Sequence, residues 1–201
     1  MEQNLQNSKS SKTSISKEKR LFIAIDLPDD LKSSLYSETK DYFSREKAVR
    51  IIPAENIHVT LKFLGDTKST KIPEISKAIN EAAGNFDSFD FKVSSKLEAF
   101  PSSKSARILF AGVGNGSDLI KDFFKNLENS LSKIHIKKEE RGFVSHITVA
   151  RVREKVNLSD MISVFELSFS KTVHCKKITL FESILSTAGS RYIIIEEFAL
   201  K

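Results

Sequence analysis

The chain has 201 residues, a hydrophobic content of 40% and a formal net charge of +6. Its length and apolar content suffice for one domain with a sizeable core. The lone cysteine, Cys175, excludes an internal disulfide, and no apolar run approaches the roughly 20 residues of a membrane-spanning helix. Because the N-terminus also lacks the apolar segment of a secretory signal, we expect a cytoplasmic protein without a membrane partner.

Residues 1–18 are rich in Ser, Lys, Asn and Gln and nearly free of apolar side chains. They bury too little to offset ordering entropy, which predicts a disordered polar tail followed by a single domain over residues 19–201. Residues 1–20 hold five basic and two acidic groups, half of the net charge. The surplus left for the domain is modest, so charge permits a short RNA end as substrate without requiring one.

Strand and helix patterns alternate along the rest of the chain. In chain order we expect a strand at 20–28, a helix from Pro28, a strand at about 56–64 that Gly65 ends, a helix at 72–84 with Gly84 as its C-cap, strands at 89–100 and 106–113, a helix at 117–133, a strand at 142–152, a short helix near 157–165, and strands at 166–173, 176–186 and 191–200. The expected buried faces hold Leu31, Leu35 and Tyr42 in the first helix and Leu119, Phe123, Leu127 and Leu131 in the third. This double alternation predicts an α+β or α/β fold with two similar halves.

Two His-x-Thr segments, NIHVTLK and VSHITVA, are the most informative feature of the sequence. The period of two in a strand places His58 and Thr60 on one face, and likewise His146 and Thr148. Each segment is otherwise apolar, and a buried imidazole and hydroxyl cost free energy unless they are hydrogen-bonded or line a wet cleft. A single such histidine is usually an ordinary, partly buried residue. Two copies, one in each half, favour a functional pair.

Two imidazoles that face one cleft can act as a general acid and a general base near neutral pH. The two threonines can donate hydrogen bonds to phosphate oxygens and stabilise charge that develops there. Arg151 follows Thr148 by an odd number of residues, so a regular strand would turn its side chain away from the histidine face. It reaches that face only if the strand ends or bulges there; otherwise it is a solvated arginine.

Metal binding and thiol chemistry are the competing uses of such residues. Structural and catalytic zinc sites need three or four protein ligands, and neither motif has a neighbouring ligand at suitable spacing. His135 and His174 lie between lysines or beside one and are expected at the surface. Cys175 has no sequence neighbour that would activate a thiolate. We therefore expect no metal and no cofactor.

Together these segments resemble the two-histidine (2H) phosphoesterases, specifically the RNA 2′,3′-cyclic phosphodiesterases that are also called bacterial or archaeal 2′–5′ RNA ligases. The resemblance runs from Arg20 to about Leu200. RLFIAIDLP is similar to the opening strand of that family, ENIHVTLKFLG to its first motif, FVSHITVARV to its second and LFESILSTAGSRY to its closing strand pair.

The resemblance implies an α+β, bilobal fold with two pseudo-symmetric lobes, each an antiparallel-rich sheet backed by helices, and an active-site cleft between them. It implies metal-independent hydrolysis of RNA 2′,3′-cyclic phosphate ends, for instance on tRNA fragments, to 2′-phosphomonoesters. His58 would protonate the leaving 3′-oxygen and His146 would activate water. The residues implied to bind substrate are Thr60, Thr148 and Arg151 for the phosphate and Phe22 for the terminal base.

Several alternatives stay open at this point. The same chemistry could act on a small cyclic nucleotide or a 2′–5′ oligonucleotide, and the resemblance also implies reversible 2′–5′ RNA ligation. A non-catalytic RNA-binding module is a further alternative, although binding alone does not need two titrating groups. The pattern contains no heptad repeat or large apolar stripe, so we expect a monomer.

Overall fold

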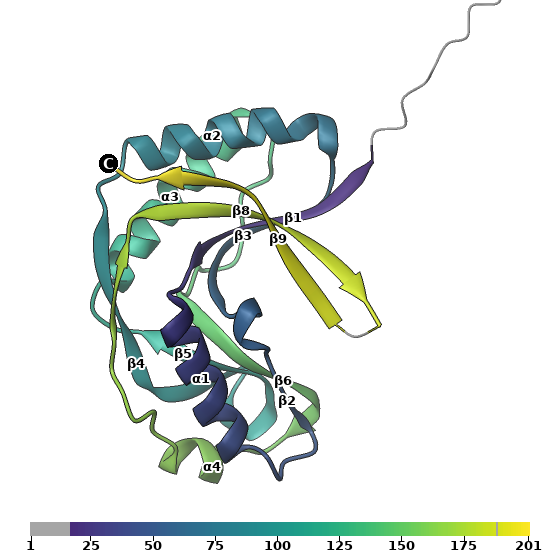
Figure 1. The fold of residues 1–201 in the computed structure, drawn as a ribbon, viewed down its shortest axis with the longest axis vertical. Coiled ribbons are helices and arrows are strands. Elements are labelled where there is room, and N and C mark those ends of the chain that lie inside the picture. The colour runs from purple at the N-terminus through teal and green to yellow at the C-terminus, as the bar shows by residue number, and fades with distance from the viewer. Residues whose placement is uncertain (1–16, 188) are drawn as a thin grey trace, which may run out of the picture.

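The computed structural model describes residues 17–187 and 189–201 (Figure 1). Within these ranges the strands are β1 (Glu18–Asp26), β2 (Val49–Ile51), β3 (His58–Lys68), β4 (Phe89–Phe100), β5 (Ala106–Val113), β6 (His146–Val156), β7 (Thr172–Cys175), β8 (Lys177–Ser186) and β9 (Gly189–Ala199). The helices are α1 (Asp29–Tyr42), α2 (Ile72–Gly84), α3 (Ser117–Lys133) and α4 (Ser159–Val164), with single 3-10 turns η1 (Ala54–Asn56), η2 (Ser69–Lys71) and η3 (Ser103–Ser105). Residues 1–16 of the tail predicted over residues 1–18 lie outside the described residues. Glu18, the last residue of that predicted tail, belongs to β1.

The strands of the described chain form one antiparallel sheet in the order β7-β4-β5-β6-β3-β1-β8-β9. Two halves of this sheet meet at β3 and β6, which are in register at one pair, Val59 opposite Ile147. Beyond that pair β6 continues beside the short strand β2 instead of β3. The predicted mixed α+β class is confirmed, with the strands in one curled antiparallel sheet.

Helices cover the sheet from both ends of the molecule (Figure 1). Helix α2 packs on β8 and β9 of one half, and α3 packs on α2. Helix α1 contacts β6 and η1 of the other half, where α4 lies against β4. Helices α2 and α3 each bury an apolar stripe because their apolar residues recur with the helical period. Among the described residues, no helix combines the length and apolarity that crossing a membrane requires.

The central strand β1 is buried on both faces, as its continuous apolar sequence predicts. Leu21, Ile23 and Ile25 point into the main core beneath the helices. Phe22 and Ala24 alternate with them and belong to a second, smaller cluster on the opposite face. This second cluster lies on the face that carries the histidines.

Three helix positions differ from the sequence prediction. Leu119 is 42% exposed, and Ile120 is buried in its place, because the four-residue spacing drifts away from the true period of 3.6. Tyr42 lies at the last turn of α1 and is also exposed, although its hydroxyl donates a hydrogen bond to the carbonyl of Met161. Gly84 is the last residue of α2, and Asn85 is the C-cap.

Strand boundaries differ more than helix boundaries. Gly65 does not end β3; it has a φ of +69° inside the strand, which continues to Lys68. Strand β2 was not predicted, since three residues carry too little pattern. The segment predicted as a strand from residue 142 has no strand partner before His146, and only Thr172–Val173 of the predicted strand 166–173 belongs to β7.

A buried ion pair fixes the irregular segment that leads into β6. Lys62 on β3 and Glu128 on α3 are 7% and 6% exposed, and Nζ and Oε1 lie 2.8 Å apart. Lys62 Nζ also donates to the carbonyl oxygen of Lys137 at 2.8 Å, and Glu128 Oε2 accepts from the backbone N–H of Glu139 at 2.6 Å. One charged pair therefore ties together a strand, a helix and the segment that precedes His146.

Removing one partner of this pair should be costly, because it leaves an uncompensated buried charge. We expect Lys62→Met to lower the free energy of unfolding by about 3–5 kcal/mol, and the double replacement Lys62→Met with Glu128→Leu to recover much of that loss. Lys125→Met, in the exposed pair with Asp122, is the control and should cost less than about 1 kcal/mol. Urea unfolding measures all three. Equal losses for Lys62→Met and Lys125→Met would contradict a structural role for the buried pair.

Candidate active site

The pairing of β3 with β6 brings the two His-x-Thr segments together. Because the strands are antiparallel with Val59 opposite Ile147, the register one step to either side sets His58 opposite Thr148 and Thr60 opposite His146. Val59 and Ile147 are fully buried on one face. The four motif residues are half-buried on the other face, so all of them line one surface as the sequence predicts.

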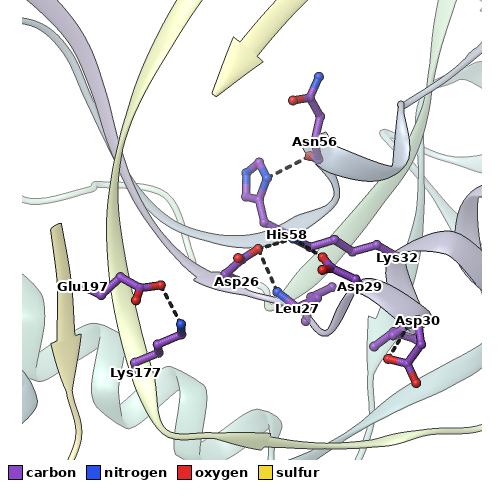
Figure 2. A network of polar contacts seen from close by, with 10 residues as sticks. Asp26, Leu27, Asp29, Asp30, Lys32, Asn56, His58, Lys177 and Glu197 are labelled. Atoms are coloured by element: carbon purple, nitrogen blue, oxygen red, sulfur yellow. Dashed lines mark hydrogen bonds and ion pairs between the residues drawn. The ribbon is translucent and has the colours of Figure 1, made fainter. Parts of the chain in front are cut away.

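Both histidines are oriented in the same way by the backbone two residues earlier. His58 Nδ1 lies 2.9 Å from the carbonyl oxygen of Asn56, as Figure 2 shows, and His146 Nδ1 lies 2.8 Å from that of Val144. A carbonyl oxygen only accepts hydrogen bonds, so Nδ1 carries the proton in each neutral ring. The Nε2 nitrogen of each ring then holds the lone pair available for proton transfer. His58 Nε2 lies 2.9 Å from Thr60 Oγ1, whose hydroxyl can donate to it.

Aromatic rings enclose each imidazole. His58 contacts Phe22 and Tyr192, with ring centroids 5.0 and 5.4 Å away. His146 contacts Phe100 and Phe110, each with its centroid 5.4 Å away. These walls limit rotation of the rings and exclude water from one side of each.

The structure contradicts the base-stacking role predicted for Phe22. Its side chain is 2% exposed and stacks on Phe181 at a centroid distance of 5.1 Å, so neither face is open to a nucleobase. Phe22 instead supports His58 from behind. The alternation of β1 explains this position, because every second residue of that strand must face the smaller cluster.

Burial controls the protonation of His58. Desolvation lowers the pKa of this imidazole from about 6.5 to about 4, because the charged form loses water that few groups replace. The Asn56 carbonyl and the carboxylate of Asp26 act in the opposite direction, while Lys32, which pairs with Asp26 at 2.6 Å (Figure 2), lowers the pKa further. The charge of His146 also lowers it, so the two imidazoles interact electrostatically.

A β-bulge brings Arg151 to the histidine face. Phe110 pairs with Thr148 and Leu109 with Ala150, so Val149 is the extra residue in β6. Val149 and Ala150 are both buried, and Arg151 is exposed on the side of Thr148. The bulge that the sequence alone left open is therefore present, and it reverses the parity that pointed Arg151 away.

The same irregularity recurs in β3, where Ala24 pairs with Thr60 and Ile23 with Lys62. Phe63 consequently occupies the position in β3 that Arg151 occupies in β6, and it is 70% exposed. Sequence reasoning missed Phe63, although its spacing of three residues after Thr60 repeats that of Arg151 after Thr148. The carbonyl partners Asn56 and Val144 were also missed, and their shared position two residues before each histidine was the available signal.

The remaining histidines and the cysteine lie away from this surface. His135 is exposed in a turn, and His174 Nδ1 contacts Asp90 Oδ1 at 2.6 Å on the exterior, which confirms both as surface residues. Cys175 is buried, and burial raises the pKa of its thiol to about 12, so it is not a nucleophile. Within residues 17–187 and 189–201, no cluster of three or more His, Cys, Asp or Glu side chains could hold a metal ion.

Comparison with known proteins agrees with this geometry. The family model of the LigT-like phosphoesterases matches residues 25–110 and 113–192. The RNA 2′,3′-cyclic phosphodiesterase of Methanocaldococcus jannaschii is 30% identical over 89% of this chain and 99% of its own length. That of Thermotoga maritima is 30% identical over 89% of this chain and 94% of its own length.

Solved structures share the fold. The protein TT0787 of Thermus thermophilus superposes with a TM-score of 0.77 at 22% identity, over 90% of this chain and 97% of that chain. Escherichia coli LigT, solved with 3′-AMP, gives a TM-score of 0.76 at 22% identity, over 92% and 99% of the two chains. The chain belongs to the LigT-like phosphoesterase family.

The lowered pKa of His58 has a consequence for stability. Between pH 6.5 and 4 the unfolded chain binds a proton that folded His58 does not, so stability falls as the pH falls through this window, by about 3 kcal/mol in total. His58→Gln lacks this loss, and its free energy of unfolding relative to the wild type should rise toward pH 4. Urea unfolding at several pH values checks this, and an NMR titration gives the His58 midpoint directly. A midpoint near 6.5 would contradict the burial argument.

Proposed function

We propose that this protein hydrolyses the 2′,3′-cyclic phosphate at an RNA end to a 2′-phosphomonoester. The observation that carries the proposal is the pair of Nδ1-anchored histidines, His58 and His146, on one face of the β3–β6 junction with a threonine opposite each. The relatives named RNA 2′,3′-cyclic phosphodiesterases match this chain over almost their whole length, which supports the same substrate class.

The two Nε2 nitrogens perform complementary proton transfers in this proposal. His146 removes a proton from water, whose oxygen bonds to phosphorus, while His58 protonates the 3′-oxygen as its bond to phosphorus breaks. Hydroxyl groups of Thr60 and Thr148 donate to the nonbridging oxygens, and the guanidinium of Arg151 offsets their charge. The phosphate stays on the 2′-oxygen. The same steps with the 5′-hydroxyl of a second RNA strand in place of water form a 2′–5′ phosphodiester, and their reverse cleaves that linkage.

The acid role of His58 requires the substrate itself. With a pKa of about 4 in the free protein, the ring is neutral at pH 7 and holds no proton on Nε2. A phosphodiester anion bound beside the ring stabilises the imidazolium and raises this pKa. Substrate binding therefore favours protonation of His58 Nε2. The carboxylate of Asp26 also raises the pKa of this imidazole.

Metal independence is the first test of this mechanism. The proposed site uses only imidazole, hydroxyl and guanidinium groups, so turnover of an oligonucleotide with a 2′,3′-cyclic phosphate end should survive exhaustive EDTA treatment within about twofold. Product analysis by chromatography distinguishes the 2′- from the 3′-phosphomonoester. Complete loss of activity that zinc or manganese restores would overturn the two-histidine mechanism.

The second test separates the roles of the two histidines. On the RNA substrate, His58→Ala and His146→Ala should each lower kcat/KM by about 10²- to 10⁴-fold. With a nitrophenyl phosphodiester the leaving group needs no proton, whereas water still needs a base. We therefore expect kcat/KM to recover largely in His58→Ala and not in His146→Ala.

The outcomes of this experiment are distinct. Recovery of His146→Ala alone would exchange the two roles and keep the site. Wild-type activity of either variant on the RNA substrate would remove the proposal. Melting temperatures of both variants control for loss of fold, because each imidazole packs against aromatic rings.

A further inference from the structure

A cavity of about 660 Å³ lies beside the histidine face, and neither histidine lines it. Arg151 forms part of its wall, together with residues of β2, η1 and the β8–β9 hairpin. Two of its residues reach the catalytic surface directly. Tyr192 is the ring that contacts His58, and Asn56 provides the carbonyl that anchors His58 Nδ1. A ligand in this cavity would therefore lie next to a phosphate that is bound between the two histidines.

Three guanidinium groups line the cavity. Arg50 on β2 is directly opposite Arg151 on β6, and Arg191 on β9 is the third. Like charges opposite each other on antiparallel strands destabilise the pairing. Among the described residues that line the cavity, Glu55 is the one carboxylate, so the positive charge exceeds the negative. Arg50 also approaches the hairpin, since a Cβ on Gly189 would lie 3.2 Å from its Nη2. This concentration of positive charge would favour binding of an anionic ligand.

Asn56 holds two walls of the cavity together. Asn56 is 8% exposed and lines the cavity, and its Nδ2 donates to the carbonyl oxygen of Ser190 at 2.7 Å. Its Oδ1 has no hydrogen-bond partner. A buried acceptor without a partner is uncommon and costs free energy. The Nδ2 hydrogen bond fixes η1 against the β8–β9 hairpin at the cavity wall.

We propose that this cavity binds the nucleotide immediately 5′ of the ribose that carries the cyclic phosphate. The inference rests on the proposed function and specifies where the RNA strand continues. Arg50 and Arg191 bind the phosphodiester that links the two nucleotides. Leu185 and Tyr192 supply apolar surface for the sugar or base. The volume lies within the usual range for small-molecule sites.

Two substrates separate this subsite from the catalytic centre. One is a dinucleotide that ends in a 2′,3′-cyclic phosphate, and the other is a nucleoside 2′,3′-cyclic phosphate without a 5′-phosphate. Arg50→Gln and Arg191→Gln should each lower kcat/KM for the dinucleotide by about tenfold or more, mainly through KM, because charge-assisted contacts to the linking phosphate are lost. The same variants should stay within about twofold of the wild type on the nucleoside substrate.

The control is Arg45→Gln, which removes one exposed positive charge from the loop between α1 and β2, outside the residues that line the cavity. It should leave both substrates unaffected. The association constant for the dinucleotide should also depend less on salt in each subsite variant. The magnitude of the slope of its logarithm against the logarithm of the salt concentration should fall by about 0.7, as expected for one lost phosphate contact on a single strand. Melting temperatures of Arg50→Gln and Arg191→Gln check that each variant keeps the fold.

Equal losses on both substrates, or no loss on the dinucleotide, would overturn the subsite. Failure of the wild-type protein to turn over either substrate would overturn the proposed function instead. Calorimetric binding of a dinucleotide with a 3′-phosphate then tests the cavity without turnover: weaker binding by Arg50→Gln and Arg191→Gln, but not by Arg45→Gln, supports it, and unchanged binding by all three refutes it.

Discussion

The single in-register pair between Val59 and Ile147 is the constraint on which the site depends. Antiparallel pairing at the first residues of both strands relates the two His-x-Thr segments by a local twofold, so each histidine lies across from the threonine of the other segment. Beyond this pair the strands diverge, and β2 takes the place of β3 beside β6. The halves of the sheet thus separate just past the histidines, and the surface between them stays open to a substrate.

Backbone carbonyl groups orient both histidines. A carbonyl oxygen two residues earlier selects the tautomer of each ring, and aromatic walls restrict its rotation. The same enclosure removes water from His58 and lowers its pKa to about 4. Packing that positions the ring therefore opposes its charged form. The electrostatic cost is compensated only when an anion occupies the site, which couples the protonation of His58 to binding.

The local twofold symmetry relates the backbones of the two motif strands but not all of their side chains. Both motif strands carry a bulge at the same place, and both bulges return the third residue after the threonine to the histidine face. That residue is Arg151 in β6 and the exposed Phe63 in β3. The surface is consequently cationic at one end, where Arg50 and Arg191 join Arg151, and aromatic at the other. An approximately symmetric backbone thus carries two chemically different ends. Such a difference is needed to bind an RNA strand in one 5′-to-3′ direction.

The sequence by itself determined the periodic elements, the pairing of each histidine with a threonine on one strand face, and the α+β class, because these follow from local periods of 2 and 3.6 residues. It could not decide the side of Arg151, the burial of Phe22 or the existence of β2. Each of these depends on a neighbouring strand: the bulge at Val149 is set by the register with β5, and Phe22 is covered by Phe181 and Tyr192 from distant β8 and β9. The cavity of Arg50, Arg151 and Arg191 likewise joins three separate strands. Long-range register and packing leave no local period in a sequence, so only the tertiary structure decided them.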